Sequence, residues 1–209
     1  MNTIEDSYMK NIGILAYGSL IEDPGIELKP LICERIVGIE TPFSIEFART
    51  SSSRDGAPTV VPVSDFGSPV KAIIMVLNEN VSIERARDLL WRRETRKEGT
   101  NEHYSTPETP SLNQVVIANI SGFLGLEDVL YTKIGANIDN LTPQKLATLA
   151  IESARAKAGS KGKDGISYLI SVKNQNIETP LMKQYETEIL RLVGADSLSE
   201  ALAIVRKNV

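Results

Sequence analysis

The sequence is poor in the residues that carry thiol and transition-metal chemistry. Its 209 residues include one cysteine, Cys33, and one histidine, His103. A single cysteine cannot form an internal disulfide, and the strand-like run Leu31-Ile32-Cys33 predicts a small buried hydrophobe rather than a nucleophile. Because a transition-metal site needs closely spaced His, Cys or carboxylate ligands, we expect no metal site here.

The sequence also lacks an excess of basic residues and any long apolar run. The net charge is −4 and the isoelectric point is about 5.2, whereas a nucleic-acid-binding surface needs clustered positive charge. No apolar run approaches the roughly 20 residues needed to cross a bilayer. The N-terminus has neither the basic nor the apolar region of a secretory signal. We therefore predict a cytoplasmic protein without nucleic-acid or membrane partners, and the oligomeric state stays open.

What the sequence does contain is typical of one soluble domain with a sizeable core, over residues 1–209. Short β-branched or apolar runs bounded by turn residues predict strands at residues 11–16, 32–40, 43–49, 59–63, 70–77 and 115–120. Consecutive apolar residues at 73–77 are typical of a strand covered on both faces. These patterns predict an α+β fold with a mixed, barrel-like β-sheet flanked by helices.

Four segments carry helix signals. Ser82 is a candidate N-cap for a helix to Glu94. Thr142-Pro143 opens a second helix, which Gly159 is expected to end, and Thr179-Pro180 repeats the same start signal. Ser197 and Glu200 form a capping box. The last two helices predict a C-terminal helical extension from about residue 180.

The first candidate site is the stretch GILAYGSLIED, residues 13–23. Gly18 follows a predicted strand and can adopt a positive φ angle. The N–H groups of Ser19, Leu20 and Ile21 would then form an anion-binding nest, which suits a developing oxyanion. A plain turn is the alternative, and the pattern alone favours it, since strand ends commonly carry Gly and Ser.

The second candidate is Glu94. Ile83, Ala86, Leu90 and Glu94 follow one another at steps of three, four and four, so the carboxylate shares a stripe with apolar residues. Loss of hydration there would favour the protonated form and suit a general base or acid near neutrality. The alternative is a solvated glutamate at a helix end, paired with Arg93 or Arg96.

The order of these motifs resembles the γ-glutamylcyclotransferase-like family, including its ChaC-like and avirulence-induced branches. The resemblance rests on YGSL after the first strand, then APTVVPV and VKAIIMVL, then LLWRRE with its closing Glu94. SYLIS followed by TPLMKQYETEIL is similar to the family's closing strand, with its tyrosine at Tyr168, and the helix after it. The loop lacks the asparagine of the γ-glutamylcyclotransferase proper, which leaves the substrate open.

The resemblance implies a cofactor-independent enzyme of the acyltransferase or amidine-lyase type. It would release 5-oxoproline from a small γ-glutamyl amino acid, amine or glutathione-like peptide, with Glu94 as general base and acid. The implied substrate-binding residues are Tyr17, Gly18, Ser19, Leu20 and Tyr168.

Three alternatives stay open beside this reading. A related enzyme would remove a γ-glutamyl protecting group from a biosynthetic intermediate. A binding or regulatory module would keep the fold without turnover. A serine hydrolase would use Ser19 as nucleophile and His103 as base. Arg49 and Arg54, beside a serine-rich loop, are either solvated or receive a peptide carboxylate.

Overall fold

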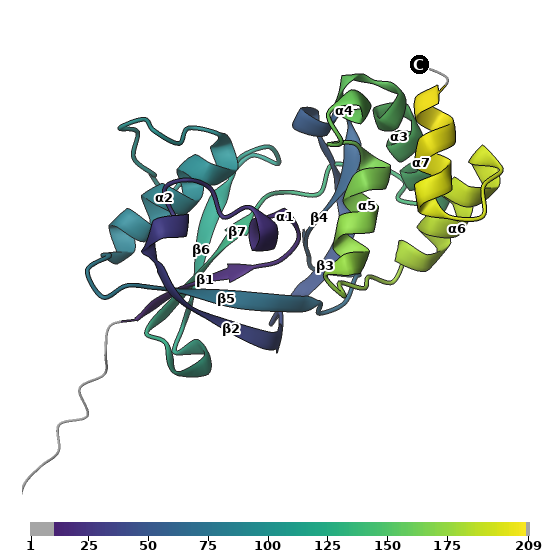
Figure 1. The fold of residues 1–209 in the computed structure, drawn as a ribbon. Helices are drawn as coiled ribbons and strands as arrows, with labels where there is room; N and C mark the ends of the chain where they lie inside the picture. The colour runs from purple at the N-terminus through teal and green to yellow at the C-terminus, as the bar shows by residue number, and fades with distance from the viewer. Residues whose placement is uncertain (1–10, 208–209) are drawn as a thin grey trace, which may run out of the picture. The chain divides into compact units, whose positions relative to one another are not determined.

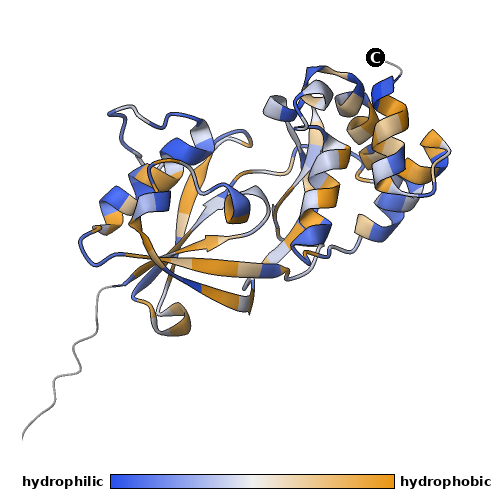
Figure 2. Ribbon diagram, viewed as in Figure 1, coloured by the Kyte–Doolittle hydropathy of each residue, from blue (hydrophilic) through white to orange (hydrophobic). Residues whose placement is uncertain are grey.

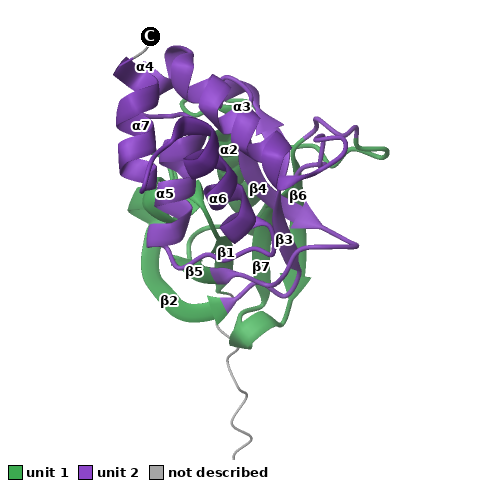
Figure 3. Ribbon diagram, turned by 90° about the vertical axis from the view of Figure 1, so that its right-hand side faces the viewer, with its two compact units in different colours: residues 1–39, 72–110, 115–133 green, residues 40–71, 111–114, 134–209 purple. Residues whose placement is uncertain are grey.

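The computed structural model describes residues 11–207, which divide into two compact units (Figure 3). Among the described residues, unit 1 consists of 11–39, 72–110 and 115–133, and unit 2 of 40–71, 111–114 and 134–207. Strands and helices occur in both units, which confirms the α+β class. One domain over residues 1–209 stays a prediction. None of the described helices has the length and apolar character needed to cross a membrane.

Unit 1 is built on a five-stranded mixed sheet (Figure 1). Its strands, in spatial order, are β2 (Ile32–Glu40), β5 (Lys71–Leu77), β1 (Ile12–Ala16), β7 (Asp128–Lys133) and β6 (Val116–Ser121). The central strand β1 runs antiparallel to β5, with Ile14 opposite Met75, and parallel to β7, with Ile14 opposite Leu130. Because β2 and β6 are edge strands, this described sheet is open, and the predicted barrel-like closure is not confirmed.

One face of this sheet packs against helix α2 (Ile83–Thr95). The Ser82 side chain accepts a hydrogen bond from the Arg85 N–H at 3.3 Å, as expected of an N-cap. The helix ends at Arg96, whose φ of 60° is left-handed. The shared core is formed by apolar side chains from α2 and four strands, including Ile12, Ile14, Ala16, Met75, Leu77, Ala86, Leu89, Leu90, Ile117 and Leu130. Figure 2 shows the apolar character of β5 in this layer.

Unit 2 combines a β-hairpin with a group of helices. The antiparallel strands are β3 (Ser44–Ser51) and β4 (Ala57–Val63). The helices are α3 (Pro143–Arg155), α4 (Lys157–Ser160), α5 (Gly165–Asn174), α6 (Met182–Val193) and α7 (Leu198–Lys207). Helix α3 packs against α5, α6, α7 and strand β4, so it is the centre of this unit.

Several sequence predictions for these elements are wrong. Strand β7 was not predicted, and the run containing Tyr168 forms helix α5 rather than a strand. Helix α3 ends at Arg155, before Gly159. Cys33 is exposed on the edge strand β2, where its side chain had been expected to be buried.

The start of helix α6 depends on a buried carboxylate from another element. Glu46 of β3 is fully buried, and its side chain accepts hydrogen bonds from the Phe47 N–H at 2.8 Å and the Thr179 hydroxyl at 2.5 Å. Its second oxygen accepts from the Leu181 N–H at 3.0 Å. The helix consequently begins at Met182, two residues after the predicted Pro180 start.

Leu90→Ala tests whether the α2 interface holds unit 1 together. Leu90 is fully buried, so removing its side chain leaves a cavity and lowers the free energy of unfolding by about 2–5 kcal/mol. Val37→Ala on the exposed β2 strand, where Val37 is 70% exposed, changes it by less than about 0.5 kcal/mol. Urea denaturation measures both, and equal effects would contradict the assigned core.

Candidate active site

The loop after β1 has a backbone that requires glycine. Gly18 has φ 59° and ψ −137°, a conformation that L-residues rarely adopt, and it precedes the short helix α1 (Ser19–Glu22). Its positive φ confirms the prediction from the sequence. Leu20 is buried in the unit 1 core, and the Tyr17 hydroxyl donates to the Thr132 carbonyl of β7 at 3.3 Å. The loop is therefore fixed on the sheet from both sides of Gly18.

The backbone N–H groups of this loop agree only in part with the predicted nest. The Ile21 N–H donates to the Gly18 carbonyl at 3.2 Å, so its inclusion among the free donors was wrong. The Asp23 N–H donates to the Ser19 carbonyl at 3.0 Å. Among residues 11–207, the N–H groups of Ser19 and Leu20 have no hydrogen-bond partner. These two N–H groups form what we call the amide pair.

Glu94 lies in the last turn of α2 and is joined to this loop by its neighbour Arg93. The Arg93 Nη1 donates to the Glu94 Oε1 at 2.6 Å. The Arg93 Nη2 donates to the Ser19 carbonyl at 3.3 Å. The Glu94 side chain is 22% exposed, so the carboxylate is paired, as one alternative held, but largely shielded from solvent. One guanidinium thus contacts both predicted site segments, and its hydrogen bond to Glu94 is charge-assisted.

The same arginine anchors the chain that follows the loop. Its Nε and Nη2 donate to the Asp23 carbonyl at 3.0 and 2.5 Å. A Cβ atom on Gly25, whose φ is 85°, would lie 2.8 Å from the Arg93 Cγ and 2.3 Å from the Glu98 Oε1. Glycine therefore permits a close approach of this segment to the end of α2.

Arg92 makes a second attachment of the same segment. Its Nε donates to the Glu27 Oε2 at 2.9 Å and its Nη2 to the Glu27 Oε1 at 3.3 Å, a two-point ion pair. Neither arginine was predicted to be a site residue from the sequence, although Arg93 was named as a possible partner of Glu94. The available signal was the doubled arginine directly before Glu94.

The only histidine in the sequence pairs with Asp88, also on α2. The His103 Nδ1 lies 2.6 Å from the Asp88 Oδ2, and the Tyr104 N–H donates to the Asp88 Oδ1 at 2.7 Å. No described hydrogen bond joins His103 to Ser19, so the geometry offers no support for the serine-hydrolase alternative. Partial burial raises the pKa of Asp88, but the hydrogen bonds from His103 and Tyr104 outweigh it and lower the pKa overall.

Tyr168 belongs to unit 2, where it is buried on helix α5. Its ring contacts Phe47 edge-on at 6.2 Å between centroids, and the Arg54 guanidinium lies 4.5 Å from the ring centroid. A role for Tyr168 in substrate binding stays a prediction.

Arg49, the other arginine beside the serine-rich loop, holds backbone within unit 2. Its Nη1 donates to the carbonyls of Leu112 and Gly135 at 2.9 and 2.7 Å. Its Nη2 donates to the Asn113 side chain at 2.9 Å. Through these contacts Arg49 joins strand β3 to the segments around residues 112 and 135, so its side chain is not simply solvated.

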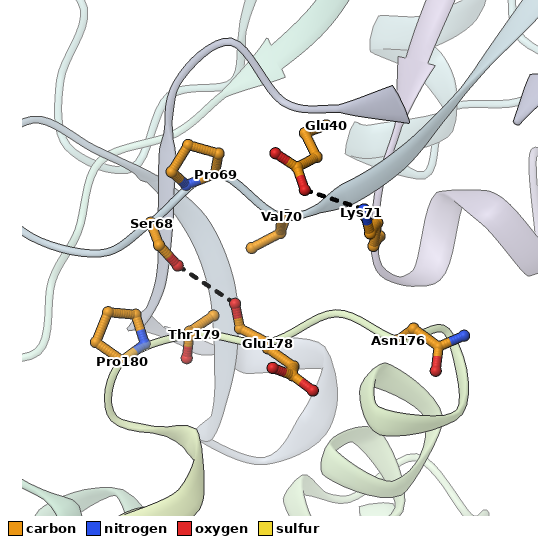
Figure 4. A pocket seen from close by; sticks show the side chains of 9 residues that line it. All are labelled: Glu40, Ser68, Pro69, Val70, Lys71, Asn176, Glu178, Thr179 and Pro180. Atoms are coloured by element: carbon orange, nitrogen blue, oxygen red, sulfur yellow. Dashed lines mark hydrogen bonds and ion pairs between the residues drawn. The ribbon is translucent and has the colours of Figure 1, made fainter. Parts of the chain in front are cut away.

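A cavity of about 490 Å³ lies within unit 2 (Figure 4). Its lining includes Glu40, Lys71 and Glu178, and Lys71 is paired with Glu40 at 3.0 Å. None of the predicted site residues lines this cavity.

Comparisons with known proteins give a fold but no family. No family model matches the sequence, and no curated protein matches it. Among solved structures, the chain is similar to the crystal structure of a yeast γ-glutamyl cyclotransferase specific to glutathione, with a TM-score of 0.54 at 12% identity. The match covers 87% of this chain and 99% of that one. At this identity the likeness shows a shared fold.

Gly18→Ala tests the loop geometry. An alanine at φ 59° and ψ −137° is strained, which lowers the free energy of unfolding by about 1–3 kcal/mol. Ser19→Ala, one residue on within α1, changes it by less than about 0.5 kcal/mol. The measurement is urea unfolding, and a Gly18→Ala protein as stable as Ser19→Ala would refute the assigned backbone.

Asp88→Asn tests the pKa of Asp88. Because this pKa is lower in the folded protein than in the unfolded chain, the ionised carboxylate stabilises the fold above the unfolded-chain pKa of about 3.9. That stabilisation is lost as pH falls through the lower, folded-state pKa. We therefore expect Asp88→Asn to lower the urea midpoint at pH 7, with the difference shrinking below pH 4. The exposed Asp65→Asn serves as control, and a pH-independent difference would contradict the assignment.

Proposed function

We propose that this protein is a γ-glutamyl cyclotransferase, which releases 5-oxoproline from a small γ-glutamyl compound. The observation that carries the proposal is the Arg93 guanidinium, which bonds the Glu94 carboxylate and the Ser19 carbonyl at once. It brings together the two segments that the sequence singled out separately. The fold likeness to the yeast cyclotransferase supports the same reading.

In this reaction the substrate supplies its own nucleophile. The α-amine of the γ-glutamyl group attacks the γ-carbonyl carbon of the same group and closes a five-membered lactam. Because nucleophile and electrophile are in one molecule, the enzyme has to hold the folded-back conformation and move protons. A chain with one histidine and one cysteine can meet these needs with a single carboxylate.

Glu94 is the proposed proton carrier. It accepts a proton from the α-ammonium, and the free amine then forms the new C–N bond. As the old amide C–N bond breaks, Glu94 gives this proton to the leaving nitrogen. It then takes the second proton from the ring nitrogen, which becomes the lactam N–H, and passes it to the departing amine, so the enzyme ends the cycle unchanged. The contact with Arg93 holds the carboxylate in place at the end of α2.

The amide pair is the proposed oxyanion site. Attack on the carbonyl places negative charge on its oxygen, and the Ser19 and Leu20 N–H groups have no other partner among the described residues. Gly18 sets the turn that orients them, and Tyr17 anchors the strand end below. The substrate-binding role of Tyr168, on helix α5 of unit 2, stays a prediction from the sequence. The leaving group, an amino acid, amine or peptide, is not specified by these contacts.

Glu94→Gln tests the proposal. The amide keeps the shape of the side chain but cannot accept the proton, so we expect 5-oxoproline release to fall by about 10²–10⁴-fold. Glu84→Gln, the same change at an exposed position on the same helix, is the matched control and keeps full activity. The assay measures 5-oxoproline from a panel of γ-glutamyl amino acids, amines and peptides.

Other outcomes separate the alternatives. Ser19→Ala keeps the backbone N–H and should retain turnover, so an inactive Ser19→Ala beside an active Glu94→Gln would indicate a serine hydrolase. Binding of γ-glutamyl compounds without any product would favour the non-catalytic module. Release of 5-oxoproline from only one larger γ-glutamyl intermediate would indicate the protecting-group enzyme.

A further inference from the structure

Arg93 has one hydrogen-bond donor more than its contacts use. A guanidinium carries five N–H groups. The Nε–H and the two Nη2–H groups donate to the carbonyls of Asp23 and Ser19, and one Nη1–H donates to Glu94. The second Nη1–H has no partner among residues 11–207.

This remaining donor lies in a shielded place. The Arg93 side chain is only 12% exposed, and an unmet donor on a shielded cation is costly. Since both Nη1 hydrogens sit on one nitrogen, an acceptor bound there is a direct neighbour of the Glu94 carboxylate. The Arg93–Glu94 pair therefore offers a free cationic donor beside an anionic acceptor.

We propose that the Arg93–Glu94 pair binds the amino-acid head of the substrate, with Arg93 taking the α-carboxylate and Glu94 the α-ammonium. The head group is a zwitterion whose two charges sit on one carbon, so it matches a side-by-side pair of opposite charges. The inference rests on the proposed function and narrows its substrate class. Only compounds whose γ-glutamyl end keeps both a free amine and a free carboxylate would be accepted efficiently.

The anchoring of Arg93 makes it suited to this role. Three of its N–H groups are held by backbone carbonyls, so the cation stays in place while its second Nη1–H donates to the substrate carboxylate. The Glu94 carboxylate lies beside it and accepts the ammonium proton. With the head group held at one end, the side chain folds back and brings the γ-carbonyl to the amine.

The test compares two substrates that both can cyclise. One is γ-glutamyl-alanine, and the other is its analogue with an α-carboxamide in place of the α-carboxylate, which would release 5-oxoproline amide. Both are assayed with the wild type, Arg93→Met and Arg93→Lys. The matched control is Arg85→Met, an exposed arginine on the same helix.

We expect the wild type and Arg85→Met to prefer the carboxylate substrate by about 10–100-fold in kcat/KM, the range of a charge-assisted hydrogen bond to a shielded cation. Arg93→Met should lower turnover of both substrates, because Arg93 also positions the loop and Glu94, but it should lower that of the carboxylate substrate about 10–100-fold further, so that the preference is lost. Arg93→Lys keeps the positive charge but not the planar arrangement of several N–H donors, so it should restore part of the preference for the carboxylate substrate. Turnover of the carboxamide substrate reports whether each variant is folded. Equal losses on both substrates, or no preference in the wild type, would overturn the assignment.

Failure of the proposed function gives a different result. If the wild type forms no 5-oxoproline, calorimetric binding of γ-glutamyl-alanine is compared between the wild type and Arg93→Met. Weaker binding to the variant would support the head-group site in a protein without turnover. Equal binding, or none, would reject it.

Discussion

The candidate site depends on one guanidinium. Arg93 joins the last turn of α2 to the loop after β1, with contacts to Glu94, the Ser19 carbonyl and the Asp23 carbonyl. Without it, a carboxylate at a helix end and a glycine turn at a strand end would be two ordinary features. The ion pair between Arg92 and Glu27 and the absence of a side chain on Gly25 hold the same segment close to the helix. A shielded cation therefore fixes the relation between the proposed proton carrier and the amide pair.

Local signals in the sequence predicted the framework of this site. The apolar run before Tyr17 predicted β1, the Ser82 cap predicted α2, and Gly18 predicted the positive φ. Each of these depends on residues within a few positions of one another. The stripe from Ile83 to Glu94 gave the side of the helix, and one alternative named Arg93 as a partner of the carboxylate. The sequence did not show that Arg93 also contacts the Ser19 carbonyl, because that contact joins residues 74 positions apart.

Two of the errors arose where distant residues decide the local structure. Strand β7 is short, and its pairing with β1, more than 100 residues earlier in the chain, stabilises it. Helix α6 starts where Glu46 of β3 accepts the Leu181 N–H, a contact that no local pattern shows. Helix α5 was missed for another reason: Asp164 caps it by accepting from the Ser167 N–H at 2.9 Å, a local signal that the β-branched and aromatic residues around Tyr168 outweighed. The oxyanion role of the amide pair and the role of Tyr168 remain predictions.

The most direct test of the account is a crystal structure of the Glu94→Gln protein with γ-glutamyl-alanine bound. The account predicts the α-ammonium beside residue 94, the α-carboxylate on the Arg93 Nη1, and the γ-carbonyl oxygen within hydrogen-bond distance of the Ser19 and Leu20 N–H groups. A ligand bound away from Arg93, for instance in the cavity lined by Glu40 and Glu178, would contradict it.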